Sequence, residues 1–152
     1  MSLKLYTLTQ NKKLTPDVFE LIFTGPEKVE MKPGQFITFL LPEIGGRAYS
    51  IAEIKWNEII LLIKRWDITH GWRGGSQILC DTKIWTEYKW VGPSGHFVLT
   101  ENSNNKLFIG TGTGLVPLYN QILGATGLWQ TGKLTLLFGI RTLEDVFYTQ
   151  EL

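Results

Sequence analysis

The sequence has very little cysteine, no excess of charge of either sign and no long hydrophobic run. Cys80 is the only cysteine, so the chain cannot form an intramolecular disulfide or hold an iron–sulfur cluster on its own cysteines. Lysine and arginine total 15 against 14 aspartates and glutamates. This balance argues against a nucleic-acid-binding protein, which usually carries a concentrated basic excess.

Signals for membranes, export and metal binding are missing as well. No apolar run is long enough to span a bilayer, and the N-terminus MSLKLYTLTQNKKLT lacks the apolar core of a signal peptide. We therefore expect a cytoplasmic protein without a membrane span. The two histidines, His70 and His96, are far apart and lack the spacing of metal ligands, so no metal site is expected. We expect Cys80 to be a buried, inert thiol.

The first hundred residues contain short apolar runs separated by glycine and proline. This pattern predicts strands over residues 3–9, 18–24, 35–41, 47–52, 59–64, 88–91 and 96–99, with a turn at 92–95. The run 59–64 is almost continuously aliphatic, as in a strand buried on both faces. Many short strands at this spacing favour an antiparallel barrel or sandwich, packed by Trp85 and Trp90. Residues 75–81 are predicted to be a short helix capped near Ser76.

The pattern changes after the polar stretch 101–105, which is typical of a linker. A strand at 107–109, a glycine-rich turn at 110–114, a helix at 116–123 and a strand at 134–138 form a predicted βαβ unit. Pro117 falls in the first helical turn, where its missing N–H costs nothing. Residues 143–152 are predicted to begin a further helix. A two-stranded parallel sheet cannot cover both of its faces, so further chain or a partner chain is expected there.

Three segments carry candidate binding chemistry, each with a simpler alternative. Arg47-Ala48-Tyr49-Ser50 offers a cation, an aromatic plane and a hydroxyl, which suit a flavin; the favoured alternative for these four residues alone is a core tyrosine covered by arginine. Gly74-Gly75-Ser76 at a helix start suits an anion, or is equally a plain turn. The segment 110–117 follows a strand and precedes a helix, which is the context that a nucleotide-binding turn requires.

Together the segments PGQFITFLLP, RAYSIAE, LLIKRW, RGGSQIL, GPSGHFVL, IGTGTGLVP and LLFGIR resemble, in this order, the ferredoxin–NADP⁺ reductase-like flavoproteins. The resemblance runs from about Leu14 to the C-terminus, and RAYS and GTGTGLVP are its most specific parts. It implies a Greek-key, flavin-binding antiparallel β-barrel over residues 1–101. Residues 106–152 would then be the first part of an α/β NAD(P)-binding domain.

The resemblance also implies a role for each motif residue. Arg47 would bind the flavin phosphate, Tyr49 would stack on the isoalloxazine, and Ser50 would donate a hydrogen bond near N5; Tyr49 and Ser50 are the catalytic candidates. The other implied cofactor-binding residues are Ile63, Lys64, Arg65, Gly74, Gly75, Ser76, Thr113, Gly114 and Pro117, with Gly139 and Arg141 on the next nucleotide-lining turn. Trp66 and Trp72 flank the flavin segment, where core or lid packing is the favoured interpretation.

The sequence departs from the family in two places. Arg73 stands where the first glycine of the phosphate segment is usual, and the late Cys-Gly segment and the third nucleotide-domain strand are missing. The implied function is a flavin-dependent reductase that passes a hydride from NAD(P)H to FAD, preferred over FMN. Electrons would then go to a separate acceptor, namely a ferredoxin, a flavodoxin, an oxygenase component or a small oxidant. The alternatives are a flavin-binding module without NAD(P)H turnover and a barrel that has lost its cofactor.

Overall fold

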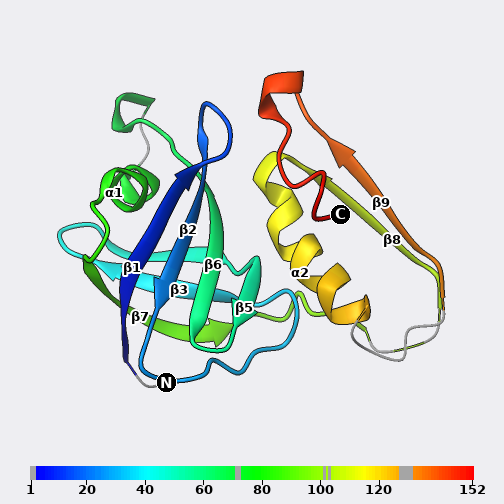
Figure 1. Cartoon of the computed structure of the whole chain (residues 1–152), viewed down its shortest axis with the longest axis horizontal. Helices are drawn as coiled ribbons and strands as arrows, with labels where there is room; N and C mark the ends of the chain where they lie inside the picture. Colours follow the sequence, from blue (N-terminus) through cyan, green and yellow to red (C-terminus); the bar gives the residue numbers. More distant parts are fainter. Residues whose placement is uncertain (1–2, 71–72, 101, 103, 127–131) are drawn as a thin grey trace.

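The computed structural model describes residues 3–70, 73–100, 102, 104–126 and 132–152. Seven antiparallel strands form one strongly curved sheet in the order β4-β3-β7-β1-β2-β6-β5 (Figure 1). Their bounds are β1 Lys4–Lys13, β2 Val18–Thr24, β3 Phe36–Leu41, β4 Gly45–Ser50, β5 Glu53–Lys55, β6 Glu58–Lys64 and β7 Glu87–Ser94. No strand pairing joins the edge strands β4 and β5 in the described chain, so the barrel is open along this seam.

The predicted double burial of the central apolar strand is confirmed. Every residue from Ile59 to Ile63 of β6 is buried. Ile59, Leu61 and Ile63 face the barrel core, whereas Ile60 and Leu62 face the second part of the chain. Side chains alternate along a strand, so a strand that reads as one hydrophobic run must be covered on both sides.

Aromatic side chains fill the barrel. Phe23, Phe39 and Tyr88 contact one another at ring-centroid distances of 4.9 to 5.8 Å, and Trp90 is fully buried against Tyr6. The prediction that Trp90 packs the barrel is confirmed, but the same prediction for Trp85 is wrong, because its side chain is 71% exposed. Trp85 lies in a turn with a φ of 74°, and its backbone N–H donates to Leu8.

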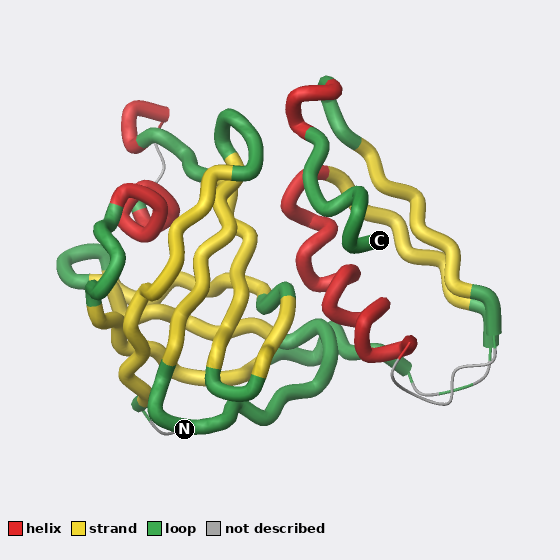
Figure 2. Tube along the Cα trace, in the orientation of Figure 1, coloured by secondary structure: helices red, strands yellow, loops and turns green. Residues whose placement is uncertain are grey.

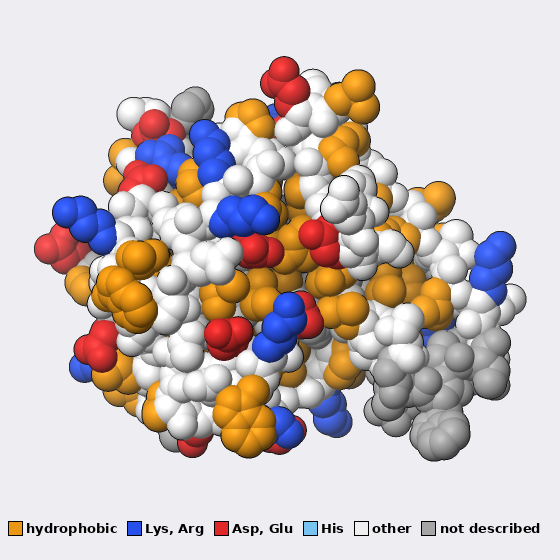
Figure 3. All heavy atoms as spheres, viewed as in Figure 1, with side chains coloured by type: hydrophobic (Ala, Val, Ile, Leu, Met, Phe, Trp, Pro, Cys, Tyr) orange, Lys and Arg blue, Asp and Glu red, His pale blue; other side chains and the backbone are white. Residues whose placement is uncertain are grey.

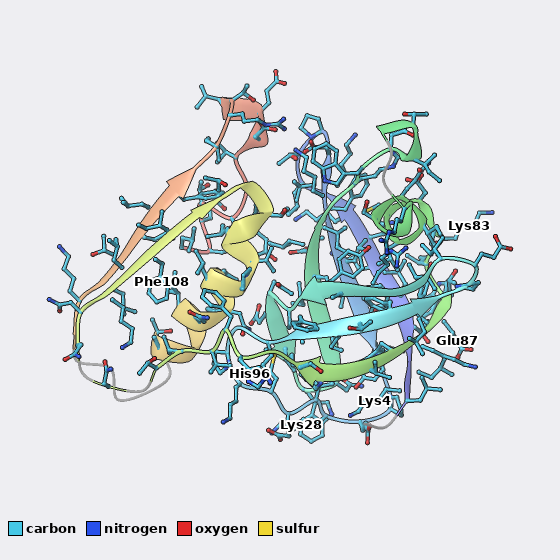
Figure 4. All side chains as sticks on the ribbon, turned by 180° about the vertical axis from the view of Figure 1, so that it is seen from behind. Lys4, Lys28, Lys83, Glu87, His96 and Phe108 are labelled. Carbon is cyan, nitrogen blue, oxygen red and sulfur yellow. The ribbon has the colours of Figure 1, made fainter. Side chains whose placement is uncertain are left out.

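The second part of the chain contains a parallel pair of strands and one long helix. Strand β8 (Lys106–Thr111) pairs with β9 (Leu134–Gly139), and helix α2 (Leu115–Thr126) lies between this pair and the barrel (Figure 2). Phe108 of β8 is buried on the side of the strand that faces α2 (Figure 4). The opposite face of the pair exposes Leu107, Ile109 and Leu137. Parallel strands are normally covered on both faces, and here only one face is covered within the described chain.

A shared hydrophobic cluster joins the two parts. From the barrel it takes Val18, Ala52, Ile60 and Leu62, and from the second part Leu115, Val116, Tyr119, Phe147 and Tyr148. Figure 3 shows apolar side chains gathered in the hollow between the parts, rimmed by acidic and basic residues. The expected fold, an antiparallel barrel followed by a small α/β unit, is thereby confirmed, with the barrel left open.

The predicted turn at 92–95 is wrong, because β7 continues through it to Ser94, which pairs with Phe36. Gly92 has a φ of 132°, a conformation that glycine adopts without the strain of a Cβ, and the β3–β7 register shifts beside it. Strand β7 is therefore irregular at this point but remains paired with β3. Residues 96–99 form no strand, and strand β5 was not predicted.

The predicted helix at 143–152 is also wrong. Only a short 3₁₀ turn, η3 (Leu143–Asp145), forms there, and Thr142 and Asp145 close it with a capping box. The chain then extends, and Tyr148 adopts a φ of 58°. Phe147 and Tyr148 are buried in the shared cluster, and the Tyr148 hydroxyl donates to Glu20 of β2. Burial of these two rings outweighs the local helical preference.

Candidate functional site

One pocket of about 600 Å³ lies where β4, the end of β6, the start of helix α1 (Gly75–Asp81) and the glycine-rich turn meet. The predicted site residues that line it are Arg47, Tyr49, Ser50, Ile63, Lys64, Gly74, Gly75, Ser76 and Thr113. These residues come from segments up to 66 positions apart in the chain, from Arg47 to Thr113. Arg65, Gly114 and Pro117 do not line the pocket.

Strand β4 presents the cation and the aromatic ring. The Arg47 guanidinium donates to the carbonyl of Gly46 at 2.6 Å and forms no ion pair with any described residue. Tyr49 packs edge-on against Phe39, at 6.0 Å between ring centroids. Burial raises the pKa of Tyr49 to about 12, with a further rise from Cys80 and a smaller opposing effect of Arg47. The phenol is therefore neutral at physiological pH, and a positive group faces the pocket.

The start of α1 is pressed against β4. Gly74 precedes the helix with a φ of 77°, and a Cβ on Gly75 would come within 2.8 Å of Arg47 Cγ and 3.0 Å of Tyr49 Oη. Glycine at 75 therefore allows the helix backbone to approach both side chains. Helix α1 spans the predicted residues, but the prediction of a cap near Ser76 is wrong. Gly74 is the N-cap, and Ser76 Oγ instead accepts a hydrogen bond from the backbone N–H of Trp66.

Ion pairs fix the end of β6 and the residue that follows it. Lys64 Nζ lies 2.6 Å from Asp17 Oδ2 and 4.8 Å from the ring centroid of Trp66. Arg65 forms a bidentate salt bridge with Asp81, with both nitrogen–oxygen distances at 2.7 Å. This bond ties the segment to the last residue of α1. Arg65 thus supports the pocket wall from outside, whereas Lys64 and Trp66 line the pocket itself.

The glycine-rich turn connects this pocket to a second one. The predicted strand, turn and helix order is confirmed: β8 ends at Thr111, a 3₁₀ turn η2 covers Gly112–Gly114, and α2 begins at Leu115 with Pro117 in its first turn. The second pocket, of about 350 Å³, is lined by Gly112, Gly139, Arg141 and Asp17 among others. Thr113 and Lys64 line both pockets, so the two adjoin.

Some pocket residues were not predicted from the sequence, namely Leu62, Val116 and Asp17. Val116 and Leu62 look like ordinary core residues, and they lie in the shared cluster. Asp17 belongs to a turn before β2, and it meets Lys64 because Val18 pairs with Lys64 in the β2–β6 ladder. No local signal marks a residue whose role comes from strand register.

The remaining sequence expectations concern metals, membranes and the cysteine. No group of three or more potential metal-ligating side chains occurs in the part of the chain that the structure describes. None of the described helices is long and apolar enough to cross a membrane. Cys80 is buried, and burial raises the pKa of its thiol to about 12, so the sulfur stays protonated. Trp72 and the side chain of His70 lie outside the described residues.

Comparison with known proteins gives consistent results. No family model matches the chain. The chain is 32% identical over 147 residues to ferredoxin–NADP reductase B of Sorangium cellulosum, a match that covers 93% of this chain and 59% of that protein. It is 28% identical over 148 residues to the ferredoxin–NAD(+) reductase component of the alkene monooxygenase system of Xanthobacter autotrophicus, covering 95% of this chain and 44% of that protein. In sequence the chain is therefore similar to ferredoxin–NAD(P)⁺ reductases over nearly all of its length.

A solved structure shows the same fold. The flavohaem-like FAD/NAD-binding domain of nitric oxide dioxygenase from Vibrio cholerae superposes with a TM-score of 0.81 at 19% identity. The match covers 97% of this chain and 67% of that one. The chain spans about half the length of the two curated reductases that it matches.

Proposed function

We propose that the chain forms the FAD-binding barrel, residues 1–101, and the first part of the NAD(P)-binding domain, residues 106–152, of an NAD(P)H-dependent flavoprotein reductase. The single observation that carries the proposal is the first pocket, which gathers all three candidate motifs around one space. The names of the relatives and the fold of the matched FAD/NAD-binding domain support it.

The residues of this pocket fit a flavin. Arg47, which forms no ion pair in the described chain, supplies a cation for a phosphate. The backbone at Gly74 and Gly75 has no side chains in the way of a phosphate. Tyr49 supplies an aromatic face, and Ser50, the last residue of β4, supplies a hydroxyl beside it. A bound flavin would accept a hydride at N5 and release electrons singly or in pairs.

The chain's own residues would orient and shield this chemistry. Tyr49 would hold the ring plane, and Ser50 would donate a hydrogen bond near N5. Thr113, Gly114 and Pro117 would approach the nicotinamide nucleotide from the glycine-rich turn, and Thr113, Gly139 and Arg141 line the second pocket. Ile63 and Lys64 would serve the ribityl or adenine side, whereas Arg65 supports the pocket wall from outside through its bond to Asp81. Because the phosphate segment and the strand beside it can together hold a dinucleotide, FAD is favoured over FMN.

The acceptor would be a separate electron carrier, such as a ferredoxin, a flavodoxin, an oxygenase component or a small oxidant. An oxygenase component fits the name of the Xanthobacter relative. The cytoplasmic location stays a prediction. A second candidate function is a flavin-binding module that does not oxidise NAD(P)H by itself, and the uncovered face of the β8–β9 pair favours it.

One experiment separates these functions. The purified chain is titrated with FAD and with FMN, and the flavin spectrum is recorded before and after anaerobic addition of NADH or NADPH. Bleaching supports the reductase, and the faster donor gives the nucleotide preference. Flavin binding without bleaching supports the binding module. Absence of binding by either flavin would overturn both functions and leave the family relationship only.

A further inference from the structure

Two buried amide side chains fasten helix α2 to the barrel. Asn120 and Gln121 are 8% and 5% exposed, and both face barrel loops. Asn120 Oδ1 accepts a hydrogen bond from Gly34 N–H at 2.8 Å, and its Nδ2 donates to the carbonyl of Ala52 at 3.1 Å. Gln121 Nε2 donates to the carbonyl of Phe97 at 2.9 Å. Buried amides with satisfied partners fix a single geometry, because each lost bond leaves a buried polar group unpaired.

The packing around these bonds is close. Gly34 has a φ of 101°, and a Cβ there would come within 2.1 Å of the carbonyl oxygen of Phe97 and 2.5 Å of Gln121 Nε2. At the next turn of α2, a Cβ on Gly124 would come within 2.4 Å of Pro33. Helix α2 and the loop before β3 are therefore in close contact, with a glycine at the contact in each of them. A shift of the helix along the loop would produce a steric clash.

The two amides differ in what they reach. Asn120 bonds to Ala52, two residues beyond Ser50 of β4, and the N–H of Ala52 is held by Ile60 of β6. Among the described residues, the Gln121 side chain hydrogen-bonds only to Phe97, which lies beyond the end of β7. Because α2 begins immediately after η2, which contains Thr113, the Asn120 bond joins the helix that follows the glycine-rich turn to the residues that follow Ser50 of β4.

We propose that Asn120 is a positioning residue that sets the distance between the glycine-rich turn and the end of β4, and thereby between bound nicotinamide and flavin. The inference rests on the proposed function. Transfer between two bound reactants depends steeply on their separation, and a shift of about 1 Å can cost on the order of a hundredfold in rate. Asn120 would touch neither reactant and would act through Ala52 and Gly34.

The decisive variants are Asn120→Leu and Asn120→Asp, with Gln121→Met as the matched control for loss of a buried amide. In the flavin-loaded chain, we expect Asn120→Leu to slow flavin reduction by NADH or NADPH about tenfold or more relative to Gln121→Met. Flavin affinity should stay within about threefold in both variants, because no contact with the flavin itself is lost.

Asn120→Asp gives a readout that general destabilisation would not produce. A protonated carboxyl at 120 can both accept from Gly34 and donate to Ala52, whereas a carboxylate cannot donate. Burial raises the pKa of such a carboxyl, and the charged groups beside it are Glu53, which lines the same crevice, and Lys55, which pairs with Glu53. We expect this variant to reduce flavin at nearly the native rate at low pH and to lose rate as the pH rises, a transition absent from the native chain.

Hydrogen exchange, followed by mass spectrometry, makes the test independent of flavin and of turnover. Exchange over residues 108–119 should accelerate in Asn120→Leu and not in Gln121→Met. Equal effects of the two variants on rate and exchange, or no pH transition in Asn120→Asp, would overturn the positioning role. If the native chain binds no flavin or does not reduce it, the proposed function fails, and the exchange comparison alone decides whether Asn120 holds the turn.

Discussion

Arg47 is the residue on which the flavin proposal depends most directly. It lies on an edge strand, it lines the larger pocket, and its charge is not neutralised by any described carboxylate. We expect Arg47→Gln to weaken flavin binding by about 10- to 100-fold, which corresponds to roughly 1.5–3 kcal/mol for a hydrogen bond to a charged group. Fluorescence titration with FAD measures the change.

The matched control is a second arginine beside the pocket. Arg65 pairs with Asp81 and does not line the pocket, so Arg65→Gln should alter flavin affinity by less than about threefold. An equal loss of affinity in both variants would show that Arg47 has no direct part in binding. A large loss in Arg65→Gln alone would favour the role that the family resemblance gives to that residue.

At the scale of elements, the contact between α1 and β4 shapes the pocket. Gly75→Ala places a methyl group within 2.8 Å of Arg47 Cγ and 3.0 Å of the Tyr49 hydroxyl. We expect this change to destabilise the fold by about 1–3 kcal/mol, as overpacking does, and to weaken flavin binding, because both displaced side chains line the pocket. Urea unfolding and flavin titration measure the two effects.

Gly114→Ala is the control for this contact. A Cβ at Gly114 meets nothing within 4 Å, so its effect on stability should stay within about 0.5 kcal/mol. If Gly75→Ala were as mild as Gly114→Ala, the helix would be free to move away from β4, and the close approach would not be a requirement of the pocket.

Local sequence predicted most elements but failed where distant contacts decide the backbone. The strand 18–24 and the helix 75–81 were predicted with the observed bounds. The proline and glycines of 92–95 indicate a turn, yet pairing with β3 keeps β7 extended through Ser94. Residues 143–152 were predicted to begin a helix, yet only a 3₁₀ turn forms at Leu143–Asp145, and burial of Phe147 and Tyr148 against the barrel keeps the rest irregular.

At the scale of the whole molecule, the shared cluster should make the two parts unfold together. Leu115 is fully buried in that cluster. We expect Leu115→Ala to lower the free energy of unfolding by about 2–5 kcal/mol and to shift the fluorescence transition of the barrel tryptophans together with the far-ultraviolet circular dichroism. Leu137→Ala, at a site 54% exposed, should change the same free energy by less than about 0.5 kcal/mol. A barrel transition that does not move would show that the parts unfold independently.

The buried Tyr6 and the partly buried Tyr49 predict loss of stability at alkaline pH. Burial, with help from Glu27, raises the pKa of Tyr6 to about 12, and burial raises the pKa of Tyr49 to about 12, against an ordinary value of 10.0. The folded state therefore favours the neutral phenols. Their contribution is fully present below pH 10 and is lost as the pH rises from 10 to 12. Urea unfolding should show this fall, and tyrosinate absorbance should rise with it. Early ionisation at about pH 10 without destabilisation would contradict the burial of these rings.

The sequence by itself determined the strand-rich first part, the turn-and-helix unit after it, and the motif residues, because apolar periodicity and glycine placement act within a few residues. Only the tertiary structure decided which of those residues share a pocket. Arg47, Gly75, Lys64 and Thr113 meet there because β4 is an edge strand, β2 pairs with β6 in one register, and α2 packs on the barrel. The same packing left Arg65 outside the pocket and gave Asn120 its two hydrogen bonds, to Gly34 and to Ala52, which no local pattern encodes.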